Sequence, residues 1–319
     1  MKPSKTTFRE RPPVGESLAR TLRVGLVNNM PDAAVEPTER QFRSLLRAAA
    51  PGEGLELVLF DMPEVSRDPA IRARMRGRYR PVEDLDRSSL DALVVTGGDP
   101  GQTSLRHSPI WPGFAGLVDR AVRLGLPTLW SCLAAHAAVE HLDGVQRRPL
   151  NAKHSGVFAV SAVRADPLLE GLGQTWPVPH SRRNGLEEAE LAGRGYEILT
   201  RSEGVGVDVF VRRGPPLFIF CQGHPEYDLD SLLREYKRDF RAYLHGERQS
   251  LPRLPHHAVP AELAQSLEQL AKRAAANRSP ALMADWPSRS EPAEQLPEWR
   301  PFAIGLYANW LRTLAQPAD

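Results

Sequence analysis

One cysteine and one His-x-Glu pair supply the residue types of a nucleophile, its base and an orienting carboxylate. The cysteine is Cys132, and the pair is His224 and Glu226. A cysteine nucleophile needs a base that takes its proton and returns it to the leaving group. That base in turn needs a carboxylate to fix its tautomer and orientation. The three side chains therefore predict covalent catalysis, provided that the fold brings them together.

Each of these residues also has an ordinary structural alternative. A cysteine in a core strand is usually a small buried apolar residue, and a histidine near a turn is more often structural. The segment Trp130–Ala134 (WSCLA) lacks the glycines of a G-x-S-x-G elbow and has a bulky Trp130 where that turn prefers a small residue. A metal site is a further alternative for Cys, His and Glu, but their spacing matches no zinc pattern, and we predict no bound metal.

The elements predicted around these residues place them at one edge of a sheet. Residues 127–132 (PTLWSC) predict a buried strand and 133–141 a helix, so that Cys132 lies at a strand-to-helix turn. Residues 217–221 predict another strand, which ends just before His224. Sites in open α/β sheets form at the carboxyl ends of the strands. A helix N-terminus at that edge favours a thiolate, and its free N–H groups can hold an oxyanion.

Strands and helices alternate along the first half of the chain. Apolar strands are predicted at 22–28, 55–60, 91–96 and 127–132, and helices at 38–49 (with a capping box of Thr38 and Gln41), 114–124 and 133–141. Residues 65–90 are Arg-rich without a clear period and predict a long surface excursion. Continuous apolar strands between helices favour a parallel sheet covered on both faces. The predicted fold class is α/β, with a doubly wound, mostly parallel sheet flanked by helices.

The second half of the chain predicts shorter strands and a helical end. The strands are expected at 157–163, 196–200, 205–211 and 217–221, and the helices at 229–244, 261–275 and 302–314. We therefore divide the chain into a Pro-rich N-terminal arm (1–21), a catalytic domain (22–250) and a linker with a helical C-terminal extension (251–319). The extension is expected to pack against the core or a dimer partner.

Composition excludes several classes of protein. The 319 residues are 41% hydrophobic and 25% charged, which is ordinary globular usage and argues against a disordered chain. The net charge is only +2 and no long basic run occurs, so no nucleic acid is expected as a partner. No apolar run is long enough for a membrane helix, and the N-terminus lacks the apolar middle of a signal peptide. Two cysteines form no disulfide framework, and the predicted location is the cytoplasm.

Several short segments, taken together, resemble the homoserine O-acyltransferase family of methionine biosynthesis, in particular its O-succinyltransferase type, which has a class I glutamine amidotransferase-like fold. The segments are 24–31 (VGLVNNMP), 38–46 (TERQFRSLL), 94–98 (VVTGG), 111–112 (WP), 130–138 (WSCLAAHAA), 153–158 (KHSGVF), 179–182 (PHSR), 223–228 (GHPEYD) and 309–311 (NWL). The resemblance covers residues 22–250 and the end of the chain. Its most specific parts are the PHSR and GHPEYD blocks in register with Cys132.

The resemblance implies a ping-pong acyl transfer from acyl-CoA to L-homoserine. Cys132 takes the acyl group as a thioester, while His224 acts as general base and acid and is oriented by Glu226. Backbone N–H groups near Gly97, Gly98 and Leu133 are the candidates for holding the oxyanion.

The resemblance also implies which residues bind the substrates. Lys153 falls on a substrate-binding lysine, Ser181 on a position linked to substrate choice, and Arg238 on the arginine that grips the amino-acid carboxylate. A guanidinium suits that last role because it pairs with a carboxylate through two hydrogen bonds. Without the resemblance, Lys153 and Arg238 would be interpreted as solvated surface cations.

Gly101 falls on the position at which the family discriminates acyl donors. A Gly there accompanies succinyl-CoA and a Glu accompanies acetyl-CoA, because Glu would fill the space and repel the succinyl carboxylate. The loop Gly97–Gly101 departs from the family pattern, and its Asp99 adds a carboxylate near the donor. We expect succinyl-CoA, with acetyl-CoA as the alternative. L-serine remains an alternative acceptor, because one methylene is worth only about 1–3 kcal/mol of discrimination.

The remaining expectations concern partners and rival functions. No bound cofactor is expected, and the resemblance implies a homodimer. His136 and His154 are expected to be structural, Cys221 is expected to be a buried free thiol, and residues 251–298 receive no catalytic role. The rival functions are a glutamine amidotransferase subunit, which would need a synthase partner, and a non-catalytic binding protein.

Overall fold

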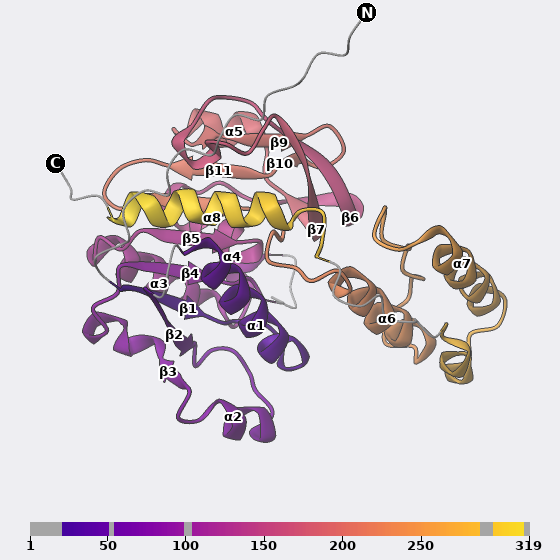
Figure 1. Ribbon diagram of the computed structural model, residues 1–319. Coiled ribbons are helices and arrows are strands. Elements are labelled where there is room, and N and C mark those ends of the chain that lie inside the picture. The colour runs from indigo at the N-terminus through magenta and orange to yellow at the C-terminus, as the bar shows by residue number, and fades with distance from the viewer. Residues whose placement is uncertain (1–20, 51–53, 99–103, 288–295, 316–319) are drawn as a thin grey trace, which may run out of the picture.

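The protein is built on an eight-stranded sheet with the order β3-β2-β1-β4-β5-β12-β11-β8 (Figure 1). The computed structural model describes residues 21–50, 54–98, 104–287 and 296–315. The strands of this sheet are β1 (Leu22–Val27), β2 (Leu55–Asp61), β3 (Tyr79–Pro81), β4 (Ala92–Val95), β5 (Thr128–Ser131), β8 (Glu197–Ile198), β11 (Val209–Arg212) and β12 (Phe218–Cys221). From β3 to β12 all neighbours are parallel, and β11 and β8 are then added antiparallel. The predicted α/β fold class is thereby confirmed.

Helices cover both faces of this sheet. The α-helices of the described chain are α1 (Asp32–Ala49), α2 (Pro69–Met75), α3 (Trp111–Arg123), α4 (Leu133–Asp143), α5 (Glu188–Gly193), α6 (Ser231–Leu244), α7 (Ala261–Ala276) and α8 (Arg300–Ala315). The apolar faces of α3 and α4 share one core with the sheet, and those of α1 and α8 share the other. Strands β4, β5 and β12 are buried along their whole length, as expected for a sheet covered on both sides.

A second, four-stranded antiparallel sheet was not predicted. Its order is β10-β9-β6-β7, with β6 (Arg148–Ala162), β7 (Thr175–Gly185), β9 (Thr200–Ser202) and β10 (Gly206–Val207). The sequence pattern did not indicate strand β7, because it holds Pro177, Pro179 and five polar or basic residues in a row (180–184). Proline is tolerated at the edge of a sheet, where an N–H group is not needed for pairing, and β7 is an edge strand. This sheet carries the PHSR block.

Two local predictions were wrong. Helix α1 begins at Asp32, not at Thr38, and Pro37 lies inside it. A proline in the second turn removes one intrahelical hydrogen bond, and the apolar face around Phe42 and Leu45 outweighs that loss. Residues 65–90 are also more regular than expected, because they contain α2, β3 and the 3₁₀ segment η1 (Val82–Arg87).

The C-terminal segment packs in two places. Helix α8 lies along α1 and buries Tyr307, Trp310 and Leu311. Helices α6 and α7, together with the 3₁₀ segment η4 (Pro280–Asp285), form a lobe at one side of the main body (Figure 1). The division of the chain at residues 21 and 250 stays a prediction.

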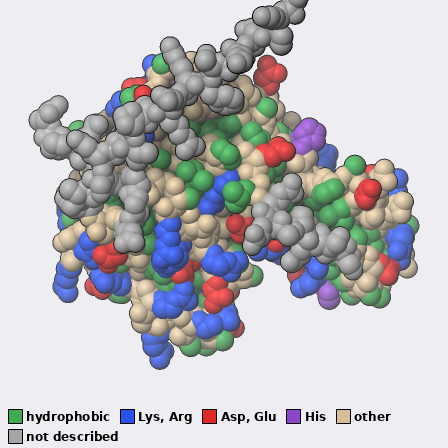
Figure 2. All heavy atoms as spheres, in the orientation of Figure 1, with side chains coloured by type: hydrophobic (Ala, Val, Ile, Leu, Met, Phe, Trp, Pro, Cys, Tyr) green, Lys and Arg blue, Asp and Glu red, His purple; other side chains and the backbone are tan. Residues whose placement is uncertain are grey.

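The surface of the protein carries charged side chains of both signs. Figure 2 shows Lys and Arg side chains intermixed with Asp and Glu on the face in view, as the small net charge implies. No helix among the described residues is long and apolar enough to cross a membrane.

Candidate active site

Cys132 lies on a strained turn between β5 and α4. Its backbone φ is 53°, a left-handed conformation that is uncommon for a non-glycine residue and costs energy. Its N–H group donates to the Cys221 carbonyl oxygen at 2.7 Å, which ties the turn to the end of β12. The side chain remains partly exposed. The sharp turn therefore presents the sulfur at the sheet edge, at the first turn of a helix, even though the flanking glycines of the usual elbow are absent.

The two candidate oxyanion glycines, Gly97 and Gly98, lie against different backbone groups. A Cβ at position 97 would lie 3.0 Å from the Leu133 amide nitrogen, so Gly97 lies directly against that N–H group. A Cβ at position 98 would lie 2.8 Å from the Asn29 carbonyl oxygen. Both positions therefore require glycine because other backbone approaches closely. Gly101 and Asp99 lie outside the described residues.

His224 is held between Cys132 and Glu226. Its Nδ1 is 2.8 Å from Glu226 Oε1, and its ring also hydrogen-bonds the Cys132 side chain. Burial by itself would lower the pKa of His224, but the charges and hydrogen bonds of Cys132 and Glu226 outweigh it and raise this pKa well above its usual value. The geometry is that of a cysteine, a base beside it and a carboxyl group that orients the base. The structure thus brings together the three side chains predicted from sequence.

A second group of charged side chains lies beside this edge, and Glu235 of α6 is at its centre. Its Oε2 accepts hydrogen bonds from Lys153 Nζ at 3.0 Å and from Ser181 Oγ. Its Oε1 accepts one from Tyr227 Oη at 2.6 Å. Burial would raise the pKa of Glu235, but the charge of Lys153 and the hydrogen bonds from Ser181 and Tyr227 lower it. Glu235 is therefore a carboxylate with three donors.

Asp239 completes this group one helical turn further along α6. It accepts from Lys153 Nζ at 3.3 Å, from Arg238 at 2.8 and 3.0 Å and from Arg248 at 3.2 Å. The Arg238 side chain is 61% exposed, so its remaining N–H groups face solvent. The predicted substrate-binding residues Lys153, Ser181 and Arg238 therefore meet in one cluster, held together by two carboxylates. We call these five residues the α6 cluster.

The sequence prediction missed Glu235, Asp239 and the part played by Tyr227. A signal existed, because Glu235 and Asp239 are four residues apart on a predicted helix that also carries Arg238, and residues at that spacing share a face. Nothing in the sequence, however, indicated that β6 and β7 would bring Lys153 and Ser181 to that face.

Three other groups lie near the edge: His136 and Cys221 are buried, and His154 is half-buried. His136 Nε2 lies 2.9 Å from Gln222 Oε1, and burial lowers its pKa to about 3. Burial likewise lowers the pKa of His154. Cys221 is a free thiol whose pKa is raised well above its usual value by burial. These groups belong to the surroundings of the site. In the described part of the chain, none of them hydrogen-bonds the Cys132 side chain.

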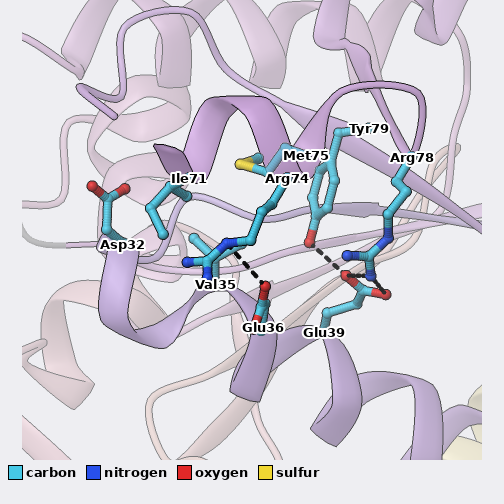
Figure 3. A pocket seen from close by; sticks show the side chains of 9 residues that line it. All are labelled: Asp32, Val35, Glu36, Glu39, Ile71, Arg74, Met75, Arg78 and Tyr79. Atoms are coloured by element: carbon cyan, nitrogen blue, oxygen red, sulfur yellow. Dashed lines mark hydrogen bonds and ion pairs between the residues drawn. The ribbon is translucent and has the colours of Figure 1, made fainter. Parts of the chain in front are cut away.

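Polar groups away from the triad and the α6 cluster form neither a metal cluster nor an open charged site in the described part of the chain. Among the described residues, no three His, Cys, Asp or Glu side chains are placed to hold a metal ion. Figure 3 shows a hollow between α1, α2 and β3, where Arg78 and Tyr79 both donate to Glu39 and no triad residue is part of the lining. Arg74 pairs with Glu36 in the same hollow, and Asp32, which also lines it, pairs with Arg67.

Comparison with known proteins gives the family. The homoserine O-succinyltransferase family model matches residues 13–318. The chain belongs to this family. A homoserine O-succinyltransferase of Methylorubrum extorquens is 50% identical over 296 residues, covering 93% of this chain and 88% of the relative. One of Rhodopseudomonas palustris is 45% identical over 308 residues, covering 96% and 92%. The resemblance inferred from the sequence motifs is confirmed.

Solved structures show the same fold at low identity. A glutamine amidotransferase of Thermotoga maritima matches with a TM-score of 0.53 and 14% identity, covering 93% of this chain and 99% of that one. A glutamine amidotransferase of Methylobacillus flagellatus gives 0.52 and 15%, covering 95% and 98%. The fold of this family member is thus glutamine amidotransferase-like, as predicted.

Proposed function

We propose that this member of the homoserine O-succinyltransferase family transfers a succinyl group from succinyl-CoA to the hydroxyl of L-homoserine through an acyl-Cys132 intermediate, in the service of methionine biosynthesis. The observation that carries the proposal is the hydrogen-bonded line of Cys132, His224 and Glu226, which begins at the strained turn after β5. Family membership supplies the two substrates.

The first half-reaction loads the cysteine. The Cys132 thiolate attacks the thioester carbonyl carbon of succinyl-CoA, and the N–H group of Leu133, packed against Gly97, helps to hold the oxyanion. The bond from the carbonyl carbon to the CoA sulfur then breaks. The departing CoA thiolate takes the proton from the His224 imidazolium, which leaves acyl-Cys132 and neutral His224.

The second half-reaction is prepared by the first. Thioester formation removes the charge of Cys132, which is a main influence that raises the pKa of His224. The imidazole is therefore more readily neutral when the acceptor arrives. It takes the proton of the homoserine hydroxyl while the oxygen attacks the thioester carbon. Cys132 leaves as thiolate, and the starting imidazolium–thiolate pair is restored.

The α6 cluster supports acceptor binding beside the triad. Arg238 has exposed N–H groups that suit the acceptor carboxylate, and Lys153 and Ser181 lie in the same cluster. Both cysteines are free thiols, which suits a cytoplasmic enzyme with a thiolate nucleophile. A homodimer and the preference set by Gly101 belong to the same proposal.

Intact-protein mass spectrometry tests this function directly. The protein is mixed with succinyl-CoA or with acetyl-CoA in the absence of any amino acid. We expect a mass gain of one succinyl group that is absent in Cys132→Ala and is discharged by homoserine. The matched control is Cys221→Ala, which should retain the adduct because that thiol is buried.

Other outcomes would correct the proposal in defined ways. Discharge by serine alone would change the acceptor, and an adduct from acetyl-CoA alone would change the donor. If neither donor forms an adduct, the acyl-transfer proposal fails. Release of ammonia from glutamine would then favour an amidotransferase.

A further inference from the structure

Tyr227 stands between the triad and the α6 cluster. Its ring stacks on the His224 imidazole with centroids 4.2 Å apart and planes inclined by 18°. Its hydroxyl donates to Glu235 Oε1 at 2.6 Å. Burial, together with the nearby charge of Glu235, raises the pKa of Tyr227 well above its usual value, so the phenol stays a protonated donor.

The Tyr227 ring restricts a tilt of the His224 ring that the hydrogen bond from Glu226 still allows. The Glu226 carboxylate fixes one ring nitrogen, Nδ1, but a single hydrogen bond leaves the ring able to tilt about that contact. A nearly parallel aromatic ring on one face blocks the tilt. It also places its electron-rich face over the imidazole, which favours the charged form. The position of the Tyr227 ring therefore helps to set where the other ring nitrogen, Nε2, points.

The backbone holds only one end of Tyr227. Its N–H group donates to the His224 carbonyl oxygen at 3.1 Å, and its own carbonyl oxygen accepts from Trp299 Nε1 at 2.9 Å. The far end of the ring is fixed by Glu235. That carboxylate uses one oxygen for Tyr227 and the other for Lys153 and Ser181. Any ligand that changes the partners of Lys153 or Ser181 therefore acts on the carboxylate that anchors the phenol.

We propose that Tyr227 is a positioning residue that couples occupancy of the α6 cluster to the orientation of the His224 ring. The inference rests on the proposed function, in which the acceptor binds at this cluster. When the acceptor engages Lys153 and Ser181, the Glu235–Tyr227 bond and the stack carry that change to the base that must receive the acceptor's proton. The coupling belongs to the second half-reaction, because the donor reacts before the acceptor binds.

Tyr227→Phe tests the coupling because it removes only the hydroxyl. The two half-reactions are followed separately, acylation by mass spectrometry with succinyl-CoA and discharge by mixing the acylated enzyme with homoserine. We expect acylation to stay within about two-fold of wild type and discharge to slow by at least ten-fold, which corresponds to about 1.4 kcal/mol or more. At steady state, kcat should fall while the KM for homoserine stays within about three-fold, because Tyr227 is buried and is not one of the residues proposed to bind the acceptor.

Two further variants make the result decisive. Tyr227→Leu removes the stack as well and should slow both half-reactions. Tyr243→Phe, the same substitution at a tyrosine of α6 outside the α6 cluster, should change neither. Equal slowing of acylation and discharge in Tyr227→Phe, or no slowing of either, would overturn the proposal. Thermal unfolding of each variant separates misfolding from a specific effect. If wild-type enzyme forms no adduct at all, the failure lies in the proposed function and not in the coupling.

Discussion

The triad edge, which is the sheet edge that carries Cys132, His224 and Glu226, and the α6 cluster hold their side chains in different ways. At the triad edge a parallel sheet holds the backbone of Cys132 in a strained turn, and a backbone hydrogen bond to the end of β12 fixes that turn. At the α6 cluster, charged side chains from β6 and α6 hold one another through ion pairs, and Ser181 of β7 adds a hydrogen bond. A rigid backbone suits a sulfur that must meet a carbonyl carbon at one angle. Ion pairs that can exchange partners suit a site that binds a zwitterionic amino acid. The charged side chains of such a site must part from one another before they can pair with the ligand.

The largest expected effect comes from breaking the triad edge. Glu226→Gln keeps the shape of the side chain but removes the charge that supports the His224 imidazolium. We expect kcat to fall about 10³-fold, with acylation and discharge both slowed, because one base serves both steps. Rapid-mixing measurement of each half-reaction checks this. A loss confined to discharge would mean that the triad edge and the α6 cluster are less separate in function than the geometry indicates.

A smaller effect is expected from the α6 cluster, and it should be confined to one step. Arg238→Lys keeps the charge but loses the planar fork that pairs with a carboxylate. We expect kcat/KM for homoserine to fall about 100-fold, from the loss of about 1.5–3 kcal/mol of charge-assisted hydrogen bonding, while acylation by succinyl-CoA is unchanged. Arg234→Lys is the control, because Arg234 lies on the same helix, pairs with the exposed carboxylates of Asp228 and Asp230 and is not part of the α6 cluster; it should have little effect. Slower acylation in Arg238→Lys would contradict the assignment of this cluster to the acceptor.

The smallest effect concerns the free energy of unfolding, and it arises from His136, which is buried near the triad edge. The folded-state pKa of His136, about 3, lies below its unfolded value near 6.5, so the unfolded chain binds the proton first as the pH falls. Neutral His136 therefore contributes to the free energy of unfolding fully above about pH 6.5, and this contribution is lost as the pH falls toward 3. In His136→Asn, the loss of unfolding free energy between pH 7 and pH 5 should be about 2 kcal/mol smaller than in wild type. Urea unfolding at the two pH values measures this, and an unchanged difference would show that His136 is not the group responsible.

The contrast also explains what sequence could and could not predict. Cys132 and His224 were predictable because each follows a short apolar strand, and the ends of parallel strands meet at one edge of a sheet. Glu226 was predictable because it lies two residues from His224. Local pattern and one topological rule therefore sufficed for the triad.

The α6 cluster depends on pairings with no local signature. Lys153 and Ser181 come from β6 and β7, and the register of these strands is set by contacts across the antiparallel sheet. Strand β7 breaks the usual strand pattern with its prolines, so neither the strand nor its neighbours could be placed. Lys153 and Ser181 were identified only through the family resemblance, and Glu235 and Asp239, which hold them, were not identified at all.

The position of α8 bears on how the protein is made. Tyr307 and Trp310 are among its most deeply buried side chains and belong to the same core as β1, β4 and β12. On the ribosome these strands emerge before α8, so the part of the sheet face that α8 covers stays exposed until this helix has been synthesised. That apolar part must be protected on the nascent chain until α8 has emerged. A stop codon upstream of α8 would leave it open to aggregation.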